Sequence, residues 1–259
     1  MPFRLRKNLS KLSEQLNNFK LSISYDGSKF FGSQIQKQNP TIAGEIFRAI
    51  SKTVQDPDKV SLIFASRTDR GVHARCNVCS FKSNTNIRPS AMKRALNSRL
   101  TKYIRINTVS LAVDENFNPR FDCVSKIYRY YFRAGGYSPY HADYCLKIPE
   151  RCDRQKMAEA ASRITGVKDF RFFSSCSSRE NTVCRIFDCF VSKGKNLFYI
   201  QIEGLHFLYK MARTIASFVV ECGVGKINPD DFDKIIGGRE KRVEPAAPGG
   251  LYLWKVKYR

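Results

Sequence analysis

The residues with the clearest potential for chemistry form one run, Ser66-Arg67-Thr68-Asp69-Arg70-Gly71-Val72-His73. Its single carboxylate, Asp69, lies between two arginines, and neighbouring guanidinium charge keeps an acid ionised near neutral pH. Such a carboxylate can act as a nucleophile or a base on an anionic substrate. Taken alone, however, the run fits better an aspartate that caps a turn, with Gly71 supplying a positive φ. The rest of the chain has to decide between the two interpretations.

The charge of the chain indicates the class of its partner. The 259 residues include 45 Lys and Arg against 23 Asp and Glu, a formal net charge of +22, and 42% of the residues are hydrophobic. This hydrophobic content is typical of a packed globular protein, whereas the charge favours a polyanionic partner, most simply nucleic acid. A membrane surface is a weaker candidate, because no long apolar run or basic amphipathic helix stands out.

The nine cysteines and three histidines form no recognisable metal or disulfide pattern. Cys76 and Cys79 are three positions apart in an expected strand, which directs them to opposite faces. We therefore expect a reducing compartment and no structural metal.

The elements that must position Asp69 alternate between strands and helices. Apolar residues at every second position predict strands, and apolar residues at helical spacing predict helices. In chain order the expected elements are a strand over 19–25, a helix over 42–54, a buried strand over 60–65, a strand over 77–81, a helix capped by Ser90 and a strand over 103–109. This β-α-β-β-α-β order is ferredoxin-like.

The second part of the chain repeats this alternation. Its expected elements are a strand over 126–132, a helix capped by Asp153, strands over 183–191 and 197–203, a helix from Leu208 to Val219, a short helix after Asn228 and a strand over 251–256. We therefore predict an α+β protein whose mixed, mainly antiparallel sheets pack together or join edge to edge. Its parts would be a basic N-terminal extension at 1–18, an N-terminal half at 19–113 that carries Asp69, and a C-terminal half at 114–259.

Six motifs in a fixed order give the sequence a specific resemblance. They are Tyr25-Asp26-Gly27-Ser28 with Phe31-Gly32-Ser33-Gln34, the octad with Ala74, Lys126-Ile127-Tyr128-Arg129-Tyr130, Asp169-Phe170 through Ser178-Arg179, Phe207-Leu208-Tyr209-Lys210-Met211-Ala212-Arg213, and Ala247-Pro248-Gly249-Gly250-Leu251-Tyr252-Leu253. From about residue 19 to the last residue, the chain resembles the TruA family of tRNA pseudouridine synthases.

The resemblance implies the pseudouridine synthase fold, a central catalytic cleft and the isomerisation of uridine in tRNA, without a cofactor or metal. It implies Asp69 as the catalytic residue, acting on the sugar or base as a nucleophile or as a base. Arg213 would pair with Asp69 and orient it, and Tyr128 would stack on the target base and take part in proton transfer from C5. Leu251 would pack against the everted base, and Arg67 would fill the vacated space or hold adjacent phosphates.

Five positions depart from the family pattern. Family members usually carry Trp at the position of Ser33, Gly at Ser66, Ala at Arg70, Val at Ala212 and Asn at Thr214. We expect Ser33 and Thr214 to lie away from Asp69 and to alter packing or RNA contacts. Arg70 adds bulk and charge beside Asp69, which would strengthen phosphate binding or shift substrate choice. None of the changes removes a residue that the chemistry requires.

The implied substrate is tRNA, with the target uridine in the anticodon stem-loop region and other RNA left open. Basic residues are expected along the RNA path, including Lys29, Arg75, Lys82, Arg88 and Arg129. Since the family works as homodimers, the resemblance implies a homodimer here. The segment 1–18 is basic and poor in acids, as a mitochondrial presequence or an RNA-binding tail would be. We expect a mitochondrial location, with the cytoplasm or nucleus as alternatives.

Two other functions compete with an isomerase. The first is a catalytically silent RNA-binding or ribosome-associated protein on the same scaffold, with Arg70 as the disabling change. The second is a metal-dependent nuclease, which needs clustered carboxylates. Asp114, Glu115 and Asp122 do not form such a pattern.

Overall fold

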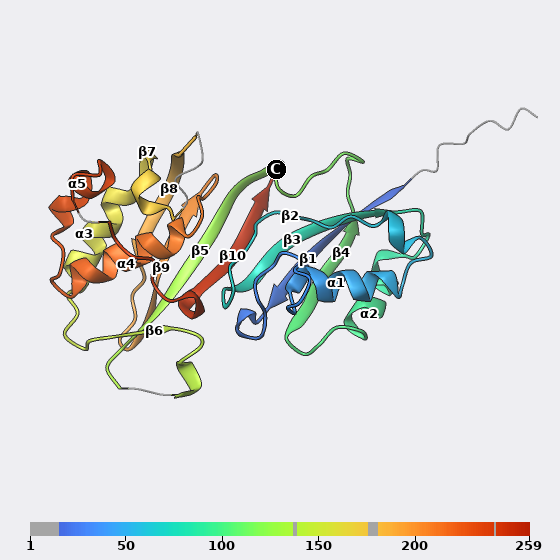
Figure 1. Cartoon of the computed structure of the whole chain (residues 1–259), viewed down its shortest axis with the longest axis horizontal. Helices are drawn as coiled ribbons and strands as arrows, with labels where there is room; N and C mark the ends of the chain where they lie inside the picture. Colours follow the sequence, from blue (N-terminus) through green and yellow to red (C-terminus); the bar gives the residue numbers. More distant parts are fainter. Residues whose placement is uncertain (1–15, 137–138, 176–180, 241) are drawn as a thin grey trace, which may run out of the picture.

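The computed structural model describes residues 16–136, 139–175, 181–240 and 242–259. Residues 1–15, on which most of the predicted N-terminal extension falls, and Ser178-Arg179 of the fourth motif lie outside the described residues. The molecule is elongated, with one group of helices at each end and two long strands, β5 (Cys123–Ala134) and β10 (Leu251–Tyr258), between them (Figure 1).

The described residues form one ten-stranded sheet with the order β4-β1-β3-β10-β5-β9-β8-β7, while β2 pairs with β3 and β6 with β5. Most pairs are antiparallel, and the β10–β3 and β5–β6 pairs are parallel. The strands are β1 Asn17–Tyr25, β2 Ile63–Phe64, β3 His73–Ser83, β4 Ile104–Leu111, β5 Cys123–Ala134, β6 Leu146–Ile148, β7 Gly166–Asp169, β8 Val183–Val191, β9 Leu197–Gly204 and β10 Leu251–Tyr258.

Strand β10 joins the two ends of the molecule into this single sheet. It lies between β3 and β5, with Leu253 opposite Ala74 on one side and Tyr128 on the other. Its alternating residues Leu251 and Leu253 are buried, so the strand also belongs to a core that extends to both sides. Of the two predicted arrangements, the sheets therefore join edge to edge.

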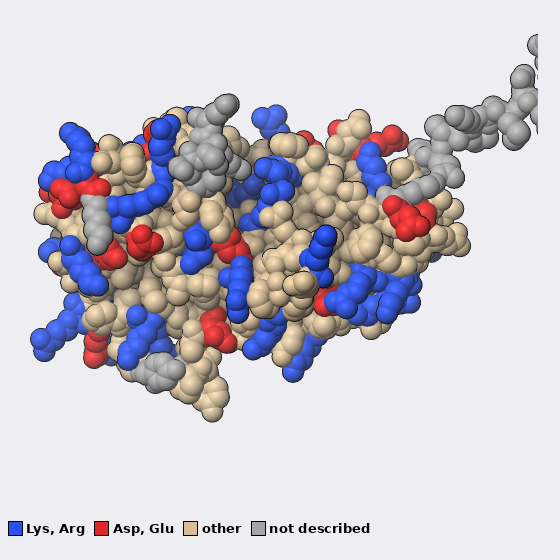
Figure 2. Space-filling view, viewed as in Figure 1, with Lys and Arg blue, Asp and Glu red and all other residues tan. Residues whose placement is uncertain are grey.

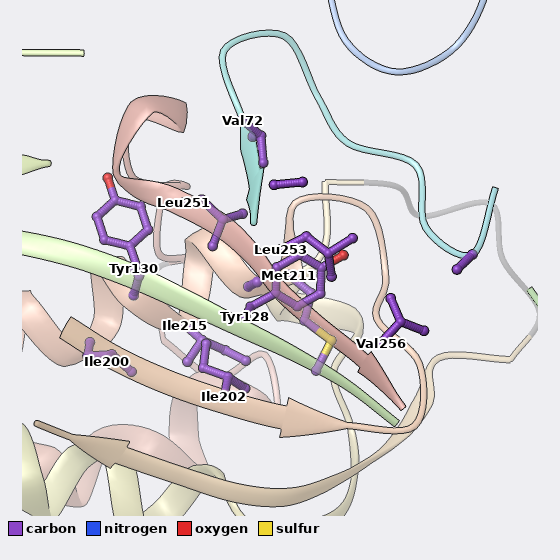
Figure 3. Packing of buried hydrophobic residues seen from close by; sticks show 14 of the residues in the cluster. Val72, Tyr128, Tyr130, Ile200, Ile202, Met211, Ile215, Leu251, Leu253 and Val256 are labelled. Atoms are coloured by element: carbon purple, nitrogen blue, oxygen red, sulfur yellow. The ribbon is translucent and has the colours of Figure 1, made fainter. Parts of the chain in front are cut away.

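Five α-helices in the described residues cover the apolar side of the sheet. They are α1 Ile42–Ser51, α2 Pro89–Asn97, α3 Arg154–Ile164, α4 Met211–Gly223 and α5 Phe232–Ile236. Short 3-10 turns lie at Gly27–Lys29, Pro57–Lys59, Pro139–His141, Arg171–Phe173, Pro229–Asp231 and Pro248–Gly250. In α4 almost every residue is buried, and Figure 3 shows Met211 and Ile215 of this helix near Tyr128 of β5 and Leu251 of β10.

Three local predictions were wrong in their bounds. The buried strand predicted over 60–65 is only Ile63–Phe64, and Ile63 is 38% exposed. Helix α2 begins at Pro89, because proline suits the first helical position, and Ser90 therefore lies inside the first turn. The N-cap residue is Arg88, whose side chain has no acceptor and makes no capping bond. Helix α4 begins at Met211 rather than Leu208, because Lys210 has a φ of +60° and breaks the helical path.

Candidate active site

Asp69 lies in the tight turn that leads into β3. The N–H of Val72 donates to the carbonyl of Asp69 at 3.1 Å. Gly71 has a φ of +79°, which is the left-handed conformation that the sequence predicted for it. The structure therefore contains the turn that the sequence predicted. This turn holds the Asp69 carboxylate at the edge of the sheet, with 28% of the side chain exposed.

The segment before Asp69 is held by polar side chains from two strands, β1 and β3, and from the loop that contains Ser33. Ser33 Oγ accepts the N–H of Thr68 at 2.8 Å, and the Thr68 hydroxyl lies 2.9 Å from the Tyr25 hydroxyl. Asn77 Nδ2 donates to the carbonyl of Ser66 at 2.9 Å. The prediction that Ser33 lies away from Asp69 was therefore wrong, because its hydroxyl bonds to the residue next to the carboxylate.

Arg213 reaches Asp69 from the first turn of α4. Its Nη1 donates to Asp69 Oδ2 at 3.2 Å, and its Nε donates to the carbonyl of Ala246 at 2.7 Å. Two acceptors on different segments fix the plane of the guanidinium, which then fixes the carboxylate. Thr214, the next residue, is buried and donates to the carbonyl of Lys210 within the helix, away from the carboxylate.

Tyr128 faces the same site from the middle of β5. The residue is 5% exposed, its ring packs edge-on against Phe207 at 4.8 Å between centroids, and its hydroxyl lies 2.8 Å from Ser66 Oγ. Burial raises the pKa of the Tyr128 phenol, and the bond to Ser66 only partly opposes this effect. The phenol therefore stays protonated at neutral pH.

A cleft of about 830 Å³ brings together all five residues that the sequence singled out. Asp69, Tyr128, Arg213, Arg67 and Leu251 line it. Leu251 is buried in its wall and Arg67 is exposed. The volume of the cleft lies in the range of small-molecule sites, so the cleft can accept one nucleoside.

The lining of the cleft is strongly basic. Among the described residues that line it, Asp69 is the only carboxylate, against five cations: Arg67, Arg120, Lys126, Lys210 and Arg213. Lys and Arg side chains are also spread along the whole length of the face shown in Figure 2. A polyanion can therefore bind across the cleft mouth and reach the carboxylate.

The cations expected along the RNA path are not the ones that line the cleft. None of Lys29, Arg75, Lys82, Arg88 and Arg129 belongs to its described lining. Arg129 follows Tyr128 in β5 and so points to the opposite face of the sheet, where its guanidinium lies 4.0 Å from the centre of the Trp254 ring. The sequence missed Arg120, Lys126 and Lys210, because a cation's orientation depends on strand register and loop path.

Arg70 does not occupy the cleft. Its guanidinium lies 4.2 Å from the centre of the Phe31 ring, and neither residue lines the cleft. A cation over an aromatic face is stabilised without a carboxylate partner. The extra bulk beside Asp69 therefore leaves the approach to the carboxylate open.

The described residues contain no group of three His, Cys, Asp or Glu side chains placed to hold a metal ion. In the same residues no helix is long and apolar enough to cross a membrane. The cysteines that the structure describes are free thiols.

Comparison with known proteins gives a consistent result. A family model described as tRNA pseudouridine synthase matches residues 21–122 and 160–259. The tRNA pseudouridine synthase A of Listeria monocytogenes serotype 4a is 34% identical over 249 residues, 94% of this chain and 100% of that protein. The proteins of the same name from Bacillus pumilus and Pseudothermotoga lettingae are each 34% identical, over 92% and 94% of this chain and 98% and 100% of their own. Among solved structures, one titled "Crystal Structure of a Cbf5-Nop10-Gar1 Complex" aligns with 78% of this chain and 45% of its own, at 8% identity and a TM-score of 0.34.

Proposed function

The chain belongs to the tRNA pseudouridine synthase family, and on that premise we propose how its cleft performs the reaction. The protein is an isomerase that converts uridine to pseudouridine in tRNA. The N1–C1′ bond of the nucleotide breaks, the uracil rotates, and C5 bonds to C1′. C5 then loses its hydrogen as a proton, and N1 gains a proton. The substrate and product have the same atoms, so no oxidant or reductant takes part.

The carboxylate of Asp69, paired with Arg213 and exposed to the cleft, is the observation that carries this proposal. Attack on the sugar, attack on the base and removal of a sugar proton all require an ionised oxygen at this place. The guanidinium holds the carboxylate in one orientation, because it is itself bonded to Ala246. Asp69 is thus prepared for a reaction before the RNA binds.

The target base must leave its stack to reach Asp69. Tyr128 and Leu251 form apolar walls on which the everted uracil packs. The Tyr128 phenol is protonated at neutral pH, so it takes part in the proton transfer from C5 by accepting that proton while it gives its own to water in the cleft. Arg67, exposed at the cleft mouth, takes the space that the base leaves or contacts the adjacent phosphates. The family resemblance and the presence of these side chains in the cleft lining support these proposed roles.

Asp69→Asn tests the function directly. Unmodified tRNA is incubated with wild type or the variant, and pseudouridines are mapped chemically. We expect the variant to lose activity by at least about 10³-fold, as for other residues that react with substrate, while its tRNA affinity is retained. Asp188→Asn, which changes an exposed acid on β8, is the matched control. Equal pseudouridine signals from wild type and Asp69→Asn would support the silent RNA-binding protein instead.

The anticodon stem-loop region is the proposed target within tRNA, on the strength of the family resemblance. Transcripts in which each uridine of that region is replaced in turn would locate the modified positions. Pseudouridine mapping of all cellular RNA after depletion of the protein would show which other RNAs are substrates. Modified positions confined to other arms of tRNA would contradict this part of the proposal.

A homodimer is proposed as the working assembly. The family resemblance supports it, and so does the sheet face opposite Tyr128, where Tyr131, Tyr199, Tyr252 and Trp254 are half-buried and pack against one another. Aromatic residues that remain partly exposed in one chain are typical of interfaces. Light scattering coupled to gel filtration should give twice the chain mass, and a monomer at working concentration would reject the dimer.

A mitochondrial location is also proposed, supported by the basic, acid-poor composition of residues 1–18. A fluorescent protein fused after residue 18 should enter mitochondria. Retention of that fusion in the cytoplasm or nucleus would contradict the proposal.

A further inference from the structure

Lys126 is a buried cation in the cleft that the mechanism above does not use. It lies two residues before Tyr128 in β5, so both side chains project from the same face of the strand, and both line the cleft. Lys126 is only 8% exposed. In the part of the chain that the structure describes, no carboxylate lies within ion-pair distance of its ammonium group.

The surroundings of Lys126 increase the cost of its charge. Its hydrogen-bond partner is Cys123, and a second cation, Arg120, lies nearby. Burial lowers the pKa of Lys126, and Arg120 lowers it further, although Cys123 opposes both effects. Arg120 is exposed and lines the cleft beside Lys126. Two cations thus share one end of the cleft without a counter-ion among the described residues.

A structural explanation of Lys126 is weak on physical grounds. Removing an ammonium group from water costs several kcal/mol unless an anion compensates it. In this cleft the carboxylate of Asp69 compensates the charge of Arg213, whereas no carboxylate among the described residues pairs with Lys126. An anion from outside the described residues would supply the full negative charge that no carboxylate provides for Lys126.

We propose that Lys126, with Arg120 beside it, binds a phosphate group of the RNA backbone next to the everted uridine. This inference rests on the proposed function and adds a binding subsite to the same cleft. A backbone phosphate carries one full negative charge, which compensates the buried charge of Lys126 and also attracts Arg120, whereas a neutral base carbonyl carries no such charge. Lys126 and Tyr128 are about 7 Å apart along the strand, which leaves room for the ribose between a base on Tyr128 and a phosphate at Lys126.

The salt dependence of RNA binding tests the phosphate contact without turnover. Affinity for unmodified tRNA is measured from about 50 to 200 mM KCl with Asp69→Asn protein, which cannot consume the substrate. Loss of one phosphate contact should reduce the slope of log affinity against log salt by about 0.7 to 0.9. Lys126→Met and Lys126→Gln should show this reduction, and Lys126→Arg should keep most of the slope. Lys156→Met, which removes an exposed lysine of α3, is the control and should leave the slope unchanged.

Thermal unfolding of the same variants separates binding from structure. If Lys126 binds RNA, Lys126→Met should melt at the same temperature as wild type or higher, because it removes a desolvated charge. A lower melting temperature or failure to fold in both neutral variants would give the lysine a structural role and overturn the proposal. An unchanged salt slope in folded Lys126→Met protein would also overturn it.

Turnover and salt dependence distinguish failure of the phosphate subsite from failure of the isomerase function. Pseudouridine formation by wild type is measured on the same tRNA. If wild type forms pseudouridine normally but the salt slope of Lys126→Met is unchanged, only the proposed phosphate subsite is contradicted. If the salt slope of Lys126→Met is reduced but wild type forms no pseudouridine, the isomerase function is contradicted and an RNA phosphate site is supported.

Discussion

The guanidinium of Arg213 bonds to Asp69 and to the Ala246 carbonyl at the same time, and this double bonding is what a lysine cannot reproduce. Arg213→Lys should therefore keep a positive charge in the site but lose the fixed orientation of the carboxylate. We expect single-turnover pseudouridine formation to fall by about 10²-fold, the effect of small misplacements in active sites, with tRNA affinity little changed. A rate within twofold of wild type would show that charge alone is sufficient.

Arg70 is the departure from the family pattern that lies next to Asp69, the proposed catalytic residue. Because its guanidinium packs on Phe31 and not in the cleft, Arg70→Ala should change the rate of pseudouridine formation by less than about threefold. Arg67→Ala, which removes a cation from the cleft itself, is the comparison and should weaken tRNA binding. A rise of tenfold or more in Arg70→Ala would mean that Arg70 restricts access to Asp69.

The residues that the sequence revealed are those carried by contiguous motifs. Asp69, Tyr128 and Arg213 each lie in such a motif, and the structure places all three around one cleft. The hydroxyls of Ser33 and Ser66 could not be assigned in this way. Each bonds to a segment far along the chain, Thr68 and Tyr128 respectively, and serine side chains carry no spacing that predicts a distant partner.

At the scale of elements, the turn before β3 depends on one glycine. Gly71 has a φ of +79°, and an added Cβ would lie 3.1 Å from Pro248 Cγ. Gly71→Ala should lower stability by about 1–2 kcal/mol, the cost of the left-handed conformation for other residues, and should lower activity because the turn presents Asp69. Urea unfolding and turnover check both effects. Gly136→Ala, where the glycine has open space and no positive φ, should change neither.

The junction of β5, β9 and β10 contains a carboxylate that makes stability depend on pH. Glu203 accepts hydrogen bonds from Ser125 Oγ at 2.6 Å and from Lys257 Nζ at 2.8 Å. Burial raises the pKa of Glu203, but these bonds and the lysine charges lower it by more, so the net pKa is below its ordinary value. A carboxyl with a lowered pKa adds stability above the pKa it has when unfolded, and this stability is lost as the pH falls through the folded value.

Glu203→Gln should therefore cost roughly 1 kcal/mol at pH 7, since the pair is only partly buried. The difference from wild type should be smaller at pH 3 than at pH 7, because the stability that the ionised carboxyl adds is lost as the pH falls through its lowered folded pKa. Urea unfolding at both pH values provides the measurement, with Glu150→Gln as an exposed control. A constant difference at both pH values would show that packing, and not charge, is responsible.

Strands with clean alternation were predicted closely, and elements set by tertiary contacts were not. The patterns over 183–191 and 197–203 match β8 and β9, since one face of each strand is buried. The pairing of β10 with β3 could not be read from either strand, because register depends on both partners. The start of α4 depends on the positive φ of Lys210, a residue type that rarely adopts it.

The whole molecule is organised around β10, which places the end of the chain in the middle of the sheet. The cleft proposed as the active site lies at the same junction. Asp69 comes from the turn before β3, Tyr128 from β5, Arg213 from α4 and Leu251 from β10 itself. Because one buried core extends across this junction, separation of the two ends would expose apolar surface and also dismantle the cleft.

This continuity predicts that the two ends unfold together. The single tryptophan, Trp254, lies in β10 between arginines of β3 and β5. The centre of its ring lies 4.6 Å from the guanidinium carbon of Arg75 and 4.0 Å from that of Arg129. Its fluorescence therefore reports on the junction, whereas circular dichroism reports on helices at both ends. The two signals should give coincident urea transitions, and truncation before residue 251 should abolish the cooperative transition, since β3 and β5 would each lose a partner strand. A tryptophan transition at lower urea than the loss of helix would show instead that the ends are independent units and that the junction opens first.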